Sequence, residues 1–435
     1  MPPIRICFLM YHGSMQSGGQ GVYLANVTRE LTRLGHAVHV VSGPPYPALD
    51  PAVRHHRLAT RSFQAMMLAR SRFFHGVPAA AHFHPLNFYE FASTRFTLTS
   101  VLATFTLRAL AELARIERGD GPFDIVHDNQ SLGYGLLGIQ RLLGRPVVAN
   151  VHHPLDVDMR TGVAHVPSLR EKVRRIAWYP WHMQRIVARR LDALISGSRA
   201  SARLIERLWA LPPDTMRTIH DGVDIDVFAP PAADETEPGT LLFVGNAEDY
   251  NKGVVYALRA LARLPASLNA HLYLVGGPAG EQRIAPREIA RVGIEGRATV
   301  VGRVSEAALA GWYRRAQVLV SPSLYEGFGL PAAEAMACGT PVIATDAGAL
   351  PEVVADGETG IIVPAADVHA LAAAMGALLA DRERCRRMGG AGRERVLREF
   401  TWGRHARGLE ALYEETRARR APAPREGGAL SASAS

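Results

Sequence analysis

Short, continuous runs of apolar residues alternate along the chain with segments that have the apolar spacing of helices. The runs are IRICFLM (4–10), AVHVVS (37–42), DIVH (124–127), PVVANV (146–151) and ALIS (193–196), then TLLFVG (240–245), AHLYLVG (270–276), ATVVG (298–302), VLVSPS (318–323), TPVIAT (340–345) and GIIVP (360–364). Apolar strands without polar alternation are typical of parallel sheets that are covered by helices on both faces. The pattern therefore predicts an α/β fold with doubly wound sheets.

A polar segment rich in Pro, Asp and Glu, APPAADETEPG at 229–239, interrupts this pattern just before a new strand. We place a linker there, which predicts two Rossmann-like domains at 1–228 and 229–403. The length of 435 residues agrees, because a single core rarely grows beyond about 250–300 residues. Two such domains face each other across a cleft at the carboxyl ends of their strands, where ligands of doubly wound folds bind.

Three segments lie outside this simple scheme. Residues 54–120 form a long insertion rich in His, Arg and aromatic residues, whose elements the pattern does not order. Residues 404–418 read as a C-terminal helix that packs back on the N-terminal domain. The tail at 419–435 is rich in Pro, Ala and Ser and is predicted to be disordered.

Composition narrows the class of protein. With 48% hydrophobic and 21% charged residues, the chain has the composition of a soluble globular protein. It contains no apolar run of the roughly 18 residues that a membrane-spanning helix needs, and the run at 4–10 is too short for a signal peptide. Its three cysteines are widely spaced and suggest neither a disulfide framework nor a zinc site. We therefore expect a cytoplasmic protein.

The net charge of +8 favours anionic partners such as nucleotide phosphates or anionic lipid, but it does not choose among them. No nucleic-acid-binding motif accompanies the charge, so we expect no nucleic acid partner. Of the 49 basic residues only Lys172 and Lys252 are lysine. A lysine against this bias suggests a position that needs a compact, rotatable ammonium group.

The segment LVSPSLYEGFGLPAAEAMACGTPVIATDAGALPEVV (319–354) carries the most chemical information. A strand ends, a Glu-Gly-Phe-Gly loop turns and a helix begins, with Pro331 suited to its first turn and Gly339 to its end. Backbone N–H groups at such a helix start bind anions. Glu326 and Glu334 either accept hydrogen bonds from hydroxyl groups of one ligand, or they only complement the helix dipole and decorate a loop.

This segment resembles the signature of glycosyltransferase family 4, whose members are retaining enzymes of the GT-B fold with an E-x7-E motif. The resemblance implies that Glu326 contacts the transferred sugar and that Glu334 contacts the nucleotide ribose. It also implies that four consecutive backbone amides bind the sugar and the diphosphate, those of Gly327, Phe328, Gly329 and Leu330. LISGSRAS (194–201) and HDGVDIDVF (220–228) resemble two further motifs of the family.

The family places an Arg and a Lys after the strand at 240–245, and both bind the donor diphosphate. The Lys position matches Lys252, whose alternative role is that of a solvated loop lysine. The Arg position holds Asn246, which can donate a hydrogen bond but brings no charge. Arg303, in the loop at 302–306, is a candidate to supply the missing charge.

Glycines and histidines supply further candidates in the N-terminal domain. Gly18, Gly19 and Gly21 follow the first strand, and they either approach the donor diphosphate from the opposite side of the cleft, as the resemblance implies, or serve a tight turn.

The histidines lie near strand ends. His127 and Asp128 follow one strand and His152 and His153 follow the next, which would place them at the cleft. The family's functional His matches His152, and the other three are candidates for the acceptor side. A histidine at such a position is otherwise structural.

We expect no metal and no cofactor. The Asp156-x-Asp158 and Asp224-x-Asp226 pairs look like metal-binding motifs, but two acids with one spacer are common by chance. The resemblance implies metal-independent catalysis. We expect a UDP- or GDP-sugar as the donor substrate and, because no dedicated nucleophile is evident, a front-face displacement at the anomeric carbon.

The acceptor stays open among a small polyol, a sugar and a lipid-linked glycan. The stretch at 170–190 combines Arg with Trp178, Tyr179 and Trp181, so it is either an interfacial helix on anionic lipid or a partly buried interdomain helix. In the first case the protein would be peripheral at the inner face of the membrane. Two other functions also fit the chain, namely a GT-B epimerase or phosphorylase, and a non-catalytic module that binds a nucleotide sugar.

Overall fold

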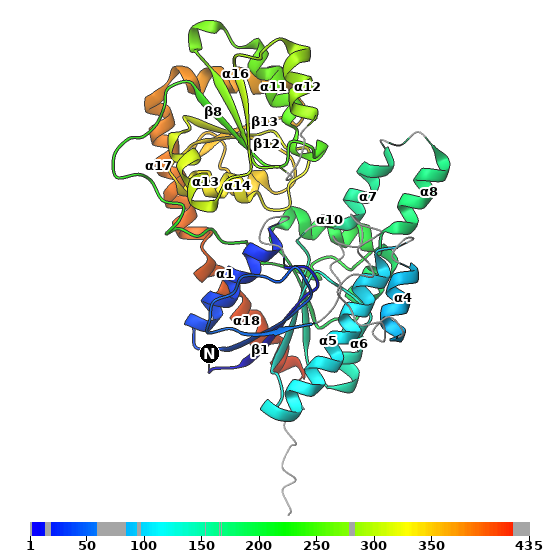
Figure 1. The fold of residues 1–435 in the computed structure, drawn as a ribbon. Coiled ribbons are helices and arrows are strands. Elements are labelled where there is room, and N and C mark those ends of the chain that lie inside the picture. The colour runs from blue at the N-terminus through cyan, green and yellow to red at the C-terminus, as the bar shows by residue number, and fades with distance from the viewer. Residues whose placement is uncertain are drawn as a thin grey trace, which may run out of the picture.

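The chain forms two α/β bodies, one above the other in the view of Figure 1. A computed structural model describes residues 2–13, 19–58, 84–93, 97–152, 154–164, 166, 168–277 and 283–420. The predicted disordered tail therefore falls outside the described residues from 421 on, as do residues 59–83 of the insertion and Gly18 of the Gly-rich loop.

The first body is built on a seven-stranded parallel sheet with the order β3-β2-β1-β4-β5-β6-β7. The strands are β1 (Arg5–Met10), β2 (Ala37–Ser42), β3 (Arg54–Arg57), β4 (Ile125–Asn129), β5 (Val147–Asn150), β6 (Ala193–Ser196) and β7 (Met216–Thr218). Its helices are α1 (Gln20–Arg33), α4 (Pro85–Ser93), α5 (Thr99–Asp120), α6 (Gly135–Leu142), α7 (Leu155–Ala164), α8 (Leu169–Trp178), α9 (Trp181–Ala188) and α10 (Arg199–Trp209). The insertion that the sequence left unordered thus supplies β3, α4 and α5.

The second body is built on a six-stranded parallel sheet with the order β10-β9-β8-β11-β12-β13. Its strands are β8 (Thr240–Val244), β9 (His271–Val275), β10 (Ala298–Gly302), β11 (Val318–Ser321), β12 (Val342–Thr345) and β13 (Gly360–Val363). Its helices are the short 3-10 turns η2 (Tyr250–Lys252) and η3 (Ala266–Leu268), then α11 (Val254–Arg263), α12 (Ile284–Val292), α13 (Glu306–Arg315), α14 (Leu330–Ala337), α15 (Leu350–Val353), α16 (Val368–Ala380) and α17 (Arg382–Glu399).

The apolar runs are continuous because each strand is buried on both faces. Along β1, Phe8 and Met10 belong to one hydrophobic cluster and Cys7 and Leu9 to another, on the opposite face of the sheet. Two clusters also cover the two faces of the second sheet. The prediction of two doubly wound parallel sheets is therefore confirmed.

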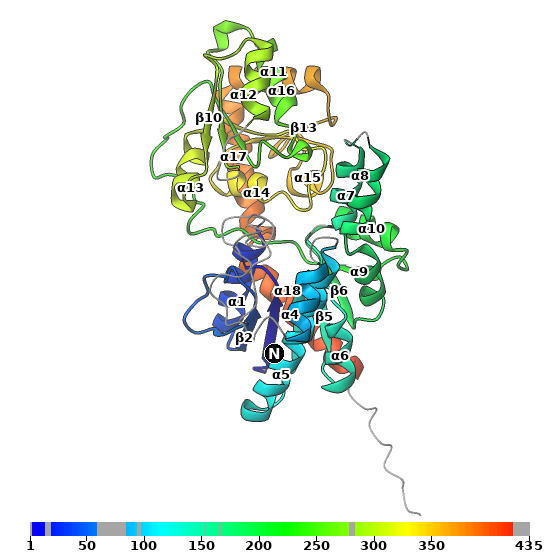
Figure 2. The same cartoon turned by 45° about the vertical axis from the view of Figure 1, so that its right-hand side comes forward.

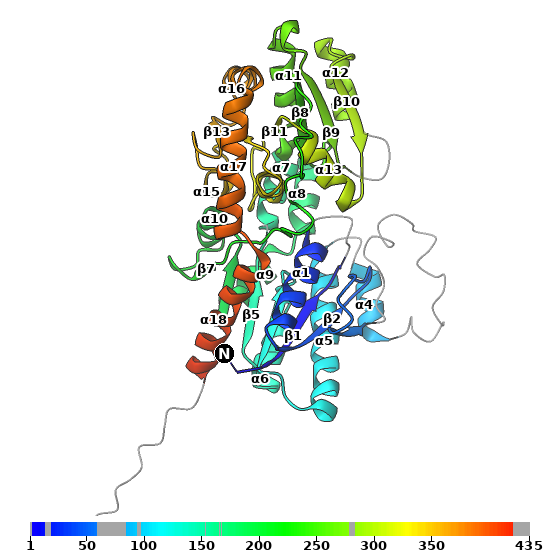
Figure 3. The same cartoon turned by 90° about the vertical axis from the view of Figure 1, so that its left-hand side faces the viewer.

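The last helix, α18 (Trp402–Arg420), leaves the second body and packs against α1 in the first (Figure 3). His405 and the hydroxyl of Tyr23 are 3.0 Å apart, and Arg417 pairs with Asp124 at 2.8 Å. Val223 donates its N–H to the carbonyl of Phe400 at 2.9 Å, so the two crossings of the chain lie side by side. The bodies are thus joined by two adjacent segments.

Helix α8 projects with α7 beside the second body (Figures 1 and 2), and none of its residues is buried. Its apolar Leu169 and Val173 are exposed. Within the described ranges, every helix is too short or too polar to pass through a bilayer. Contact of this helix with anionic lipid stays a prediction.

Candidate active site

An ion pair between Lys252 and Glu326 joins two loops at the carboxyl edge of the second sheet. Lys252 Nζ lies 2.9 and 3.1 Å from the two carboxylate oxygens of Glu326. Lys252 ends η2 after β8, and Glu326 lies in the loop after β11, the strand that pairs with β8. A backbone hydrogen bond of 2.7 Å from Leu324 to Asn251 ties the two loops together, and Ser323 Oγ donates to Glu326 at 3.2 Å.

The pair is largely shielded from solvent, with 28% of the Lys252 side chain and 13% of the Glu326 side chain exposed. Burial alone would lower the pKa of Lys252, but the attraction and hydrogen bonds of the Glu326 carboxylate outweigh it, so the pKa is raised. Lys252 is therefore a fixed cation. An anion that enters this site competes with Glu326 for the Lys252 ammonium group.

The backbone of Glu326 is held by the loop after β12. Ala349 donates its N–H to the Glu326 carbonyl at 3.0 Å. Gly348 has a φ of +58°, and a Cβ there would lie 2.2 Å from the same carbonyl oxygen. Only glycine fits this contact, so Gly348 sets the position of Glu326.

The next residue, Gly327, rests directly on the first body. Its carbonyl accepts hydrogen bonds from Ser198 Oγ at 2.6 Å and Ser201 Oγ at 3.0 Å, both at the start of α10. A Cβ on Gly327 would lie 2.9 Å from the carbonyl oxygen of His152. The two domains therefore meet at the loop that carries Glu326.

The start of α14 faces the start of α1. Gly329 caps α14 with a φ of +103°, and Pro331 lies in its first turn. Gly19 caps α1 with a φ of +66°, and a Cβ on it would lie 3.9 Å from Leu330 Cδ1. Gly21 lies inside α1 and is buried. Two helix N-termini, each favourable to anions, thus converge on one place.

The side chain of Phe328 points away from this place. It is 5% exposed and packs against the ring of Phe400, with ring centroids 5.6 Å apart. Only the backbone N–H of Phe328 can therefore take part in binding the sugar or the diphosphate, as the resemblance implied.

Glu334 lies in α14 and is held by Tyr313 of α13. The Tyr313 hydroxyl donates to its carboxylate at 2.7 Å. Burial raises the pKa of Glu334 to about 8, although the hydrogen bond from Tyr313 works in the opposite direction. The carboxyl group therefore carries a proton near neutral pH, and it can donate as well as accept.

Asn246 and Arg303 are both exposed at the edge where the strands of the second sheet end. Asn246 Oδ1 accepts the N–H of Glu248 at 3.0 Å. Arg303 follows β10, two strands away from β8, and donates to the carbonyl of Gly277 at 3.2 Å. The two residues share an edge of the sheet with Lys252.

His152 follows β5 and is oriented by the turn after β4. Its Nε2 lies 2.6 Å from Asn129 Oδ1, and its N–H donates to Gln130 Oε1 at 2.8 Å. The ring stands edge-on to Tyr23. Burial lowers the pKa of His152 to about 3, with a smaller effect from His405. The imidazole is therefore neutral, and Nε2–H donation to Asn129 leaves Nδ1 as an acceptor.

The expectation that His127 faces the cleft is wrong. Strand β4 continues to Asn129, so His127 lies inside the sheet, where it is fully buried, stacks on Phe8 and contacts the Tyr413 hydroxyl at 2.5 Å. Residue 413 belongs to α18, which covers this face of the sheet.

Asp128 is also fully buried, and it is a structural residue of the β4 turn rather than a cleft residue. It accepts hydrogen bonds from Ser131 Oγ and, at 2.8 Å, from the N–H of Leu132, which has a φ of +48°. His153 falls outside the described residues.

Two aspartates of the suspected metal motifs have structural partners. Asp156 accepts the indole N–H of Trp209 at 2.9 Å, and Asp224 pairs with Arg29 at 2.8 Å. In the part of the chain that the structure describes, no three His, Cys, Asp or Glu residues are grouped to hold a metal ion.

Glu352, for which no role was predicted, also bridges the domains. From α15 its carboxylate accepts the N–H groups of Arg199 at 3.0 Å and Ala200 at 2.7 Å, at the start of α10. Burial acts to raise its pKa, but these hydrogen bonds and that from His220 lower the pKa to about 2. The only feature of the sequence that pointed to Glu352 was its position within the segment 319–354. The same is true of Ser323, which bonds to Glu326.

Comparison with known proteins agrees with this geometry. The model of the family described as Glycosyltransferase Family 4 matches residues 17–227, and that described as Glycosyl transferases group 1 matches residues 238–381. The two matches fall on the two bodies of the structure.

The relatives are similar over nearly the full chain. An MMP alpha-(1->4)-mannosyltransferase of Mycolicibacterium hassiacum is 39% identical over 96% of this chain and 99% of its own. A D-inositol 3-phosphate glycosyltransferase of Xylanimonas cellulosilytica is 29% identical over 96% and 98%. Among solved structures, a sucrose-phosphate synthase of Thermosynechococcus elongatus superposes with a TM-score of 0.71 at 25% identity, over 96% of this chain and 100% of that one.

A first prediction concerns Gly348. Gly348→Ala should lower kcat of glycosyl transfer at least about tenfold, because the new Cβ displaces the carbonyl of Glu326. Gly357→Ala is the matched control, since Gly357 has a φ of +76° and nothing within 4 Å of its ideal Cβ. Both variants should lose about 1–2 kcal/mol of stability to backbone strain. Equal kcat values in the two variants would contradict the positioning role.

A second prediction concerns the protonation of Glu334. Its pKa is raised from 4.5 to about 8, so the stability it contributes is complete below pH 4.5 and is lost as the pH rises through about 8. Between pH 4.5 and about 8 the unfolding free energy of the wild type should therefore fall relative to that of Glu334→Gln. Chemical denaturation at several pH values measures it. A difference that is independent of pH would show that Glu334 is ionised throughout.

Proposed function

The chain belongs to glycosyltransferase family 4, and we propose that this glycosyltransferase moves a hexose from a nucleoside diphosphate sugar to an acceptor hydroxyl with retention of configuration. The observation that carries the proposal is the Lys252–Glu326 pair beside the start of α14. A cation and helix N–H groups suit a diphosphate, and a carboxylate suits sugar hydroxyl groups, so one place offers partners for both halves of the donor.

Lys252 exchanges partners when the donor binds. In the resting enzyme its ammonium group is held by Glu326. The donor diphosphate carries more negative charge than one carboxylate and draws the ammonium group to itself. Glu326 is then released to accept hydrogen bonds from the sugar. The same exchange places the cation on the group that leaves, where negative charge develops in the transition state.

The transfer needs no nucleophile from the protein. The acceptor oxygen attacks the anomeric carbon from the face that the diphosphate leaves, the bond between that carbon and the phosphate oxygen breaks, and the acceptor proton passes to the same phosphate oxygen. The products are the glycoside and the nucleoside diphosphate. The protein positions the two substrates and stabilises charge.

Residues of the first body complete the donor site. His152 is neutral, and its Nδ1 can accept a hydrogen bond from a sugar hydroxyl. Gly19 lies against Leu330, so the start of α1 adds N–H groups beside the diphosphate. Arg303, at the same edge of the sheet, is the candidate for the charge that Asn246 does not bring. In this proposal Lys252, Arg303 and the helix N-termini neutralise the diphosphate without a metal ion.

The relatives suggest the sugar and the acceptor. The 39% identity to a mannosyltransferase that forms an alpha-(1->4) linkage makes mannose the first candidate sugar and a saccharide the first candidate acceptor. The second relative acts on a phosphorylated polyol, which is the alternative acceptor.

The test of this function is the slow release of nucleoside diphosphate from a panel of UDP-, GDP- and ADP-sugars in the absence of acceptor. One nucleoside diphosphate should be released from its sugar donor much faster than the others. GDP-mannose and UDP-hexoses are the first donors to test. The anomeric configuration of the product with acceptor, measured by NMR, should equal that of the donor. Binding of a nucleoside diphosphate without turnover of any donor would instead indicate a non-catalytic module.

A third prediction uses the two lysines of the chain. Lys252→Ala should cost about 2–4 kcal/mol of transition-state stabilisation, which is roughly 30- to 1000-fold in kcat/KM for the donor. Lys252→Arg should recover part of it, because a planar fork replaces a compact ammonium group. Lys172→Ala, on α8, is the control and should leave kcat/KM unchanged. A Lys252→Ala enzyme with wild-type kcat/KM would remove this residue from the mechanism.

A further inference from the structure

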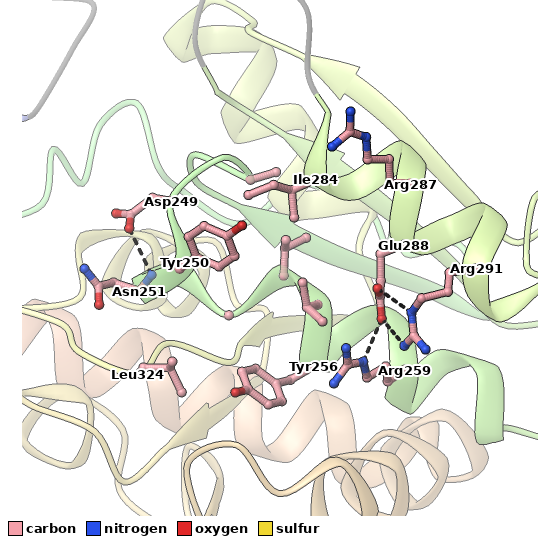
Figure 4. A pocket seen from close by; sticks show the side chains of 14 residues that line it. Asp249, Tyr250, Asn251, Tyr256, Arg259, Ile284, Arg287, Glu288, Arg291 and Leu324 are labelled. Atoms are coloured by element: carbon pink, nitrogen blue, oxygen red, sulfur yellow. Dashed lines mark hydrogen bonds and ion pairs between the residues drawn. The ribbon is translucent and has the colours of Figure 1, made fainter. Parts of the chain in front are cut away.

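A cavity lies in the second body, between the starts of α11 and α12 and the loop after β8 (Figure 4). Its volume is about 460 Å³, which is within the range of small-molecule sites. Neither Lys252 nor Glu326 lines it. The cavity is therefore separate from the donor site described above.

The cavity and the donor site share a wall. Asn251, Gly253 and Leu324 line the cavity, while Lys252, between the first two, turns to Glu326. The bond from Leu324 to Asn251 belongs to the same wall. Because consecutive Cα atoms are about 3.8 Å apart, the cavity begins one loop thickness from the ion pair.

Two tyrosines give the cavity flat apolar surfaces. Tyr250 is 54% exposed, and Tyr256 is half-buried on the first turn of α11. In Figure 4 both rings lie between Asp249 and Asn251 on one side and the arginines on the other. A ring with a flat apolar face and a polar rim suits the apolar face of a sugar ring together with its hydroxyl groups.

A fixed set of hydrogen-bond donors lies on the opposite side. Arg259 Nε is 2.6 Å from Glu288, and Arg291 contacts both oxygens of that carboxylate at 2.6 and 2.8 Å. The bond from Arg291 is the main reason that the pKa of Glu288 is lowered to about 2. A guanidinium group has five N–H donors, and these contacts use one of Arg259 and two of Arg291. Among the described residues the other N–H groups make no further hydrogen bond and can donate to a ligand.

The charges of the lining nearly cancel. Arg259 and Arg291 are balanced by Glu288 and Asp249, which leaves only Arg287 in excess. Such a balance is poorly suited to a nucleotide or another polyanion. It suits a neutral ligand with many hydroxyl groups.

We propose that this cavity binds a sugar unit of a saccharide chain, the acceptor or product of the enzyme, away from the end where transfer takes place. The proposal rests on the proposed function, since it takes the substrate to be a saccharide. Binding of this extra sugar unit makes the enzyme prefer long saccharides over short ones.

The test is calorimetric titration with α-(1→4)-linked mannooctaose and mannobiose. The wild type should bind the octasaccharide at least about tenfold more tightly, and Tyr250→Ala and Tyr256→Leu should each remove most of that difference. Tyr89→Ala is the matched control, because Tyr89 is 49% exposed on α4 of the other body. It should keep the preference.

Equal affinity for the two saccharides in the wild type, or an unchanged preference in both tyrosine variants, would overturn the proposal. A measurement of donor hydrolysis without acceptor distinguishes a failure of the cavity proposal from a failure of the proposed function. That activity should be unchanged in Tyr256→Leu, and it would be absent from the wild type only if the proposed function were wrong.

Discussion

The position of one carboxylate, that of Glu326, depends on contacts from three directions. The ammonium group of Lys252 holds its oxygens, Gly348 and Ala349 hold its backbone, and the residue that follows it is bonded to α10 of the other body. Removal of any one of these contacts would move the group. The pair with Lys252 also keeps a cation in a shielded place, where the proposed mechanism needs it for the donor diphosphate.

The same loop brings the two domains together. Gly327 rests on His152, and Leu330 lies beside Gly19, so the start of α14 lies against the first body. Glu352 adds a carboxylate to the start of α10, close to where the serines bond to Gly327. The chain crosses between the bodies through two paired segments near Val223 and Phe400. The bodies are therefore joined at this crossing, at α18 and at the loop of Glu326.

Local sequence was sufficient to predict the features that depend on residues close together in the chain. The apolar runs predicted the parallel sheets because both faces of each strand are buried, and the glycines, Pro331 and the acids of 319–354 predicted a loop followed by a helix. Contacts between distant residues could not be predicted in this way. His127 looked like a strand-end residue, yet its partner Tyr413 is 286 positions away and buries it. The contact of Tyr313 with Glu334, and that of Glu352 with the start of α10, depend on how helices and domains pack, and no spacing in the chain encodes them.

In the proposed mechanism Lys252 leaves Glu326 for the donor diphosphate. Because the chain contains only two lysines, ¹⁵N labelling of lysine gives two side-chain ammonium signals, and a Lys172→Arg variant assigns them. The protein is titrated with the nucleoside diphosphate that the donor panel identifies, and the signals are followed by NMR. The Lys252 signal should shift in proportion to saturation, while that of Lys172 should stay in place. A Lys252 signal that does not change while calorimetry shows full binding would contradict this mechanism.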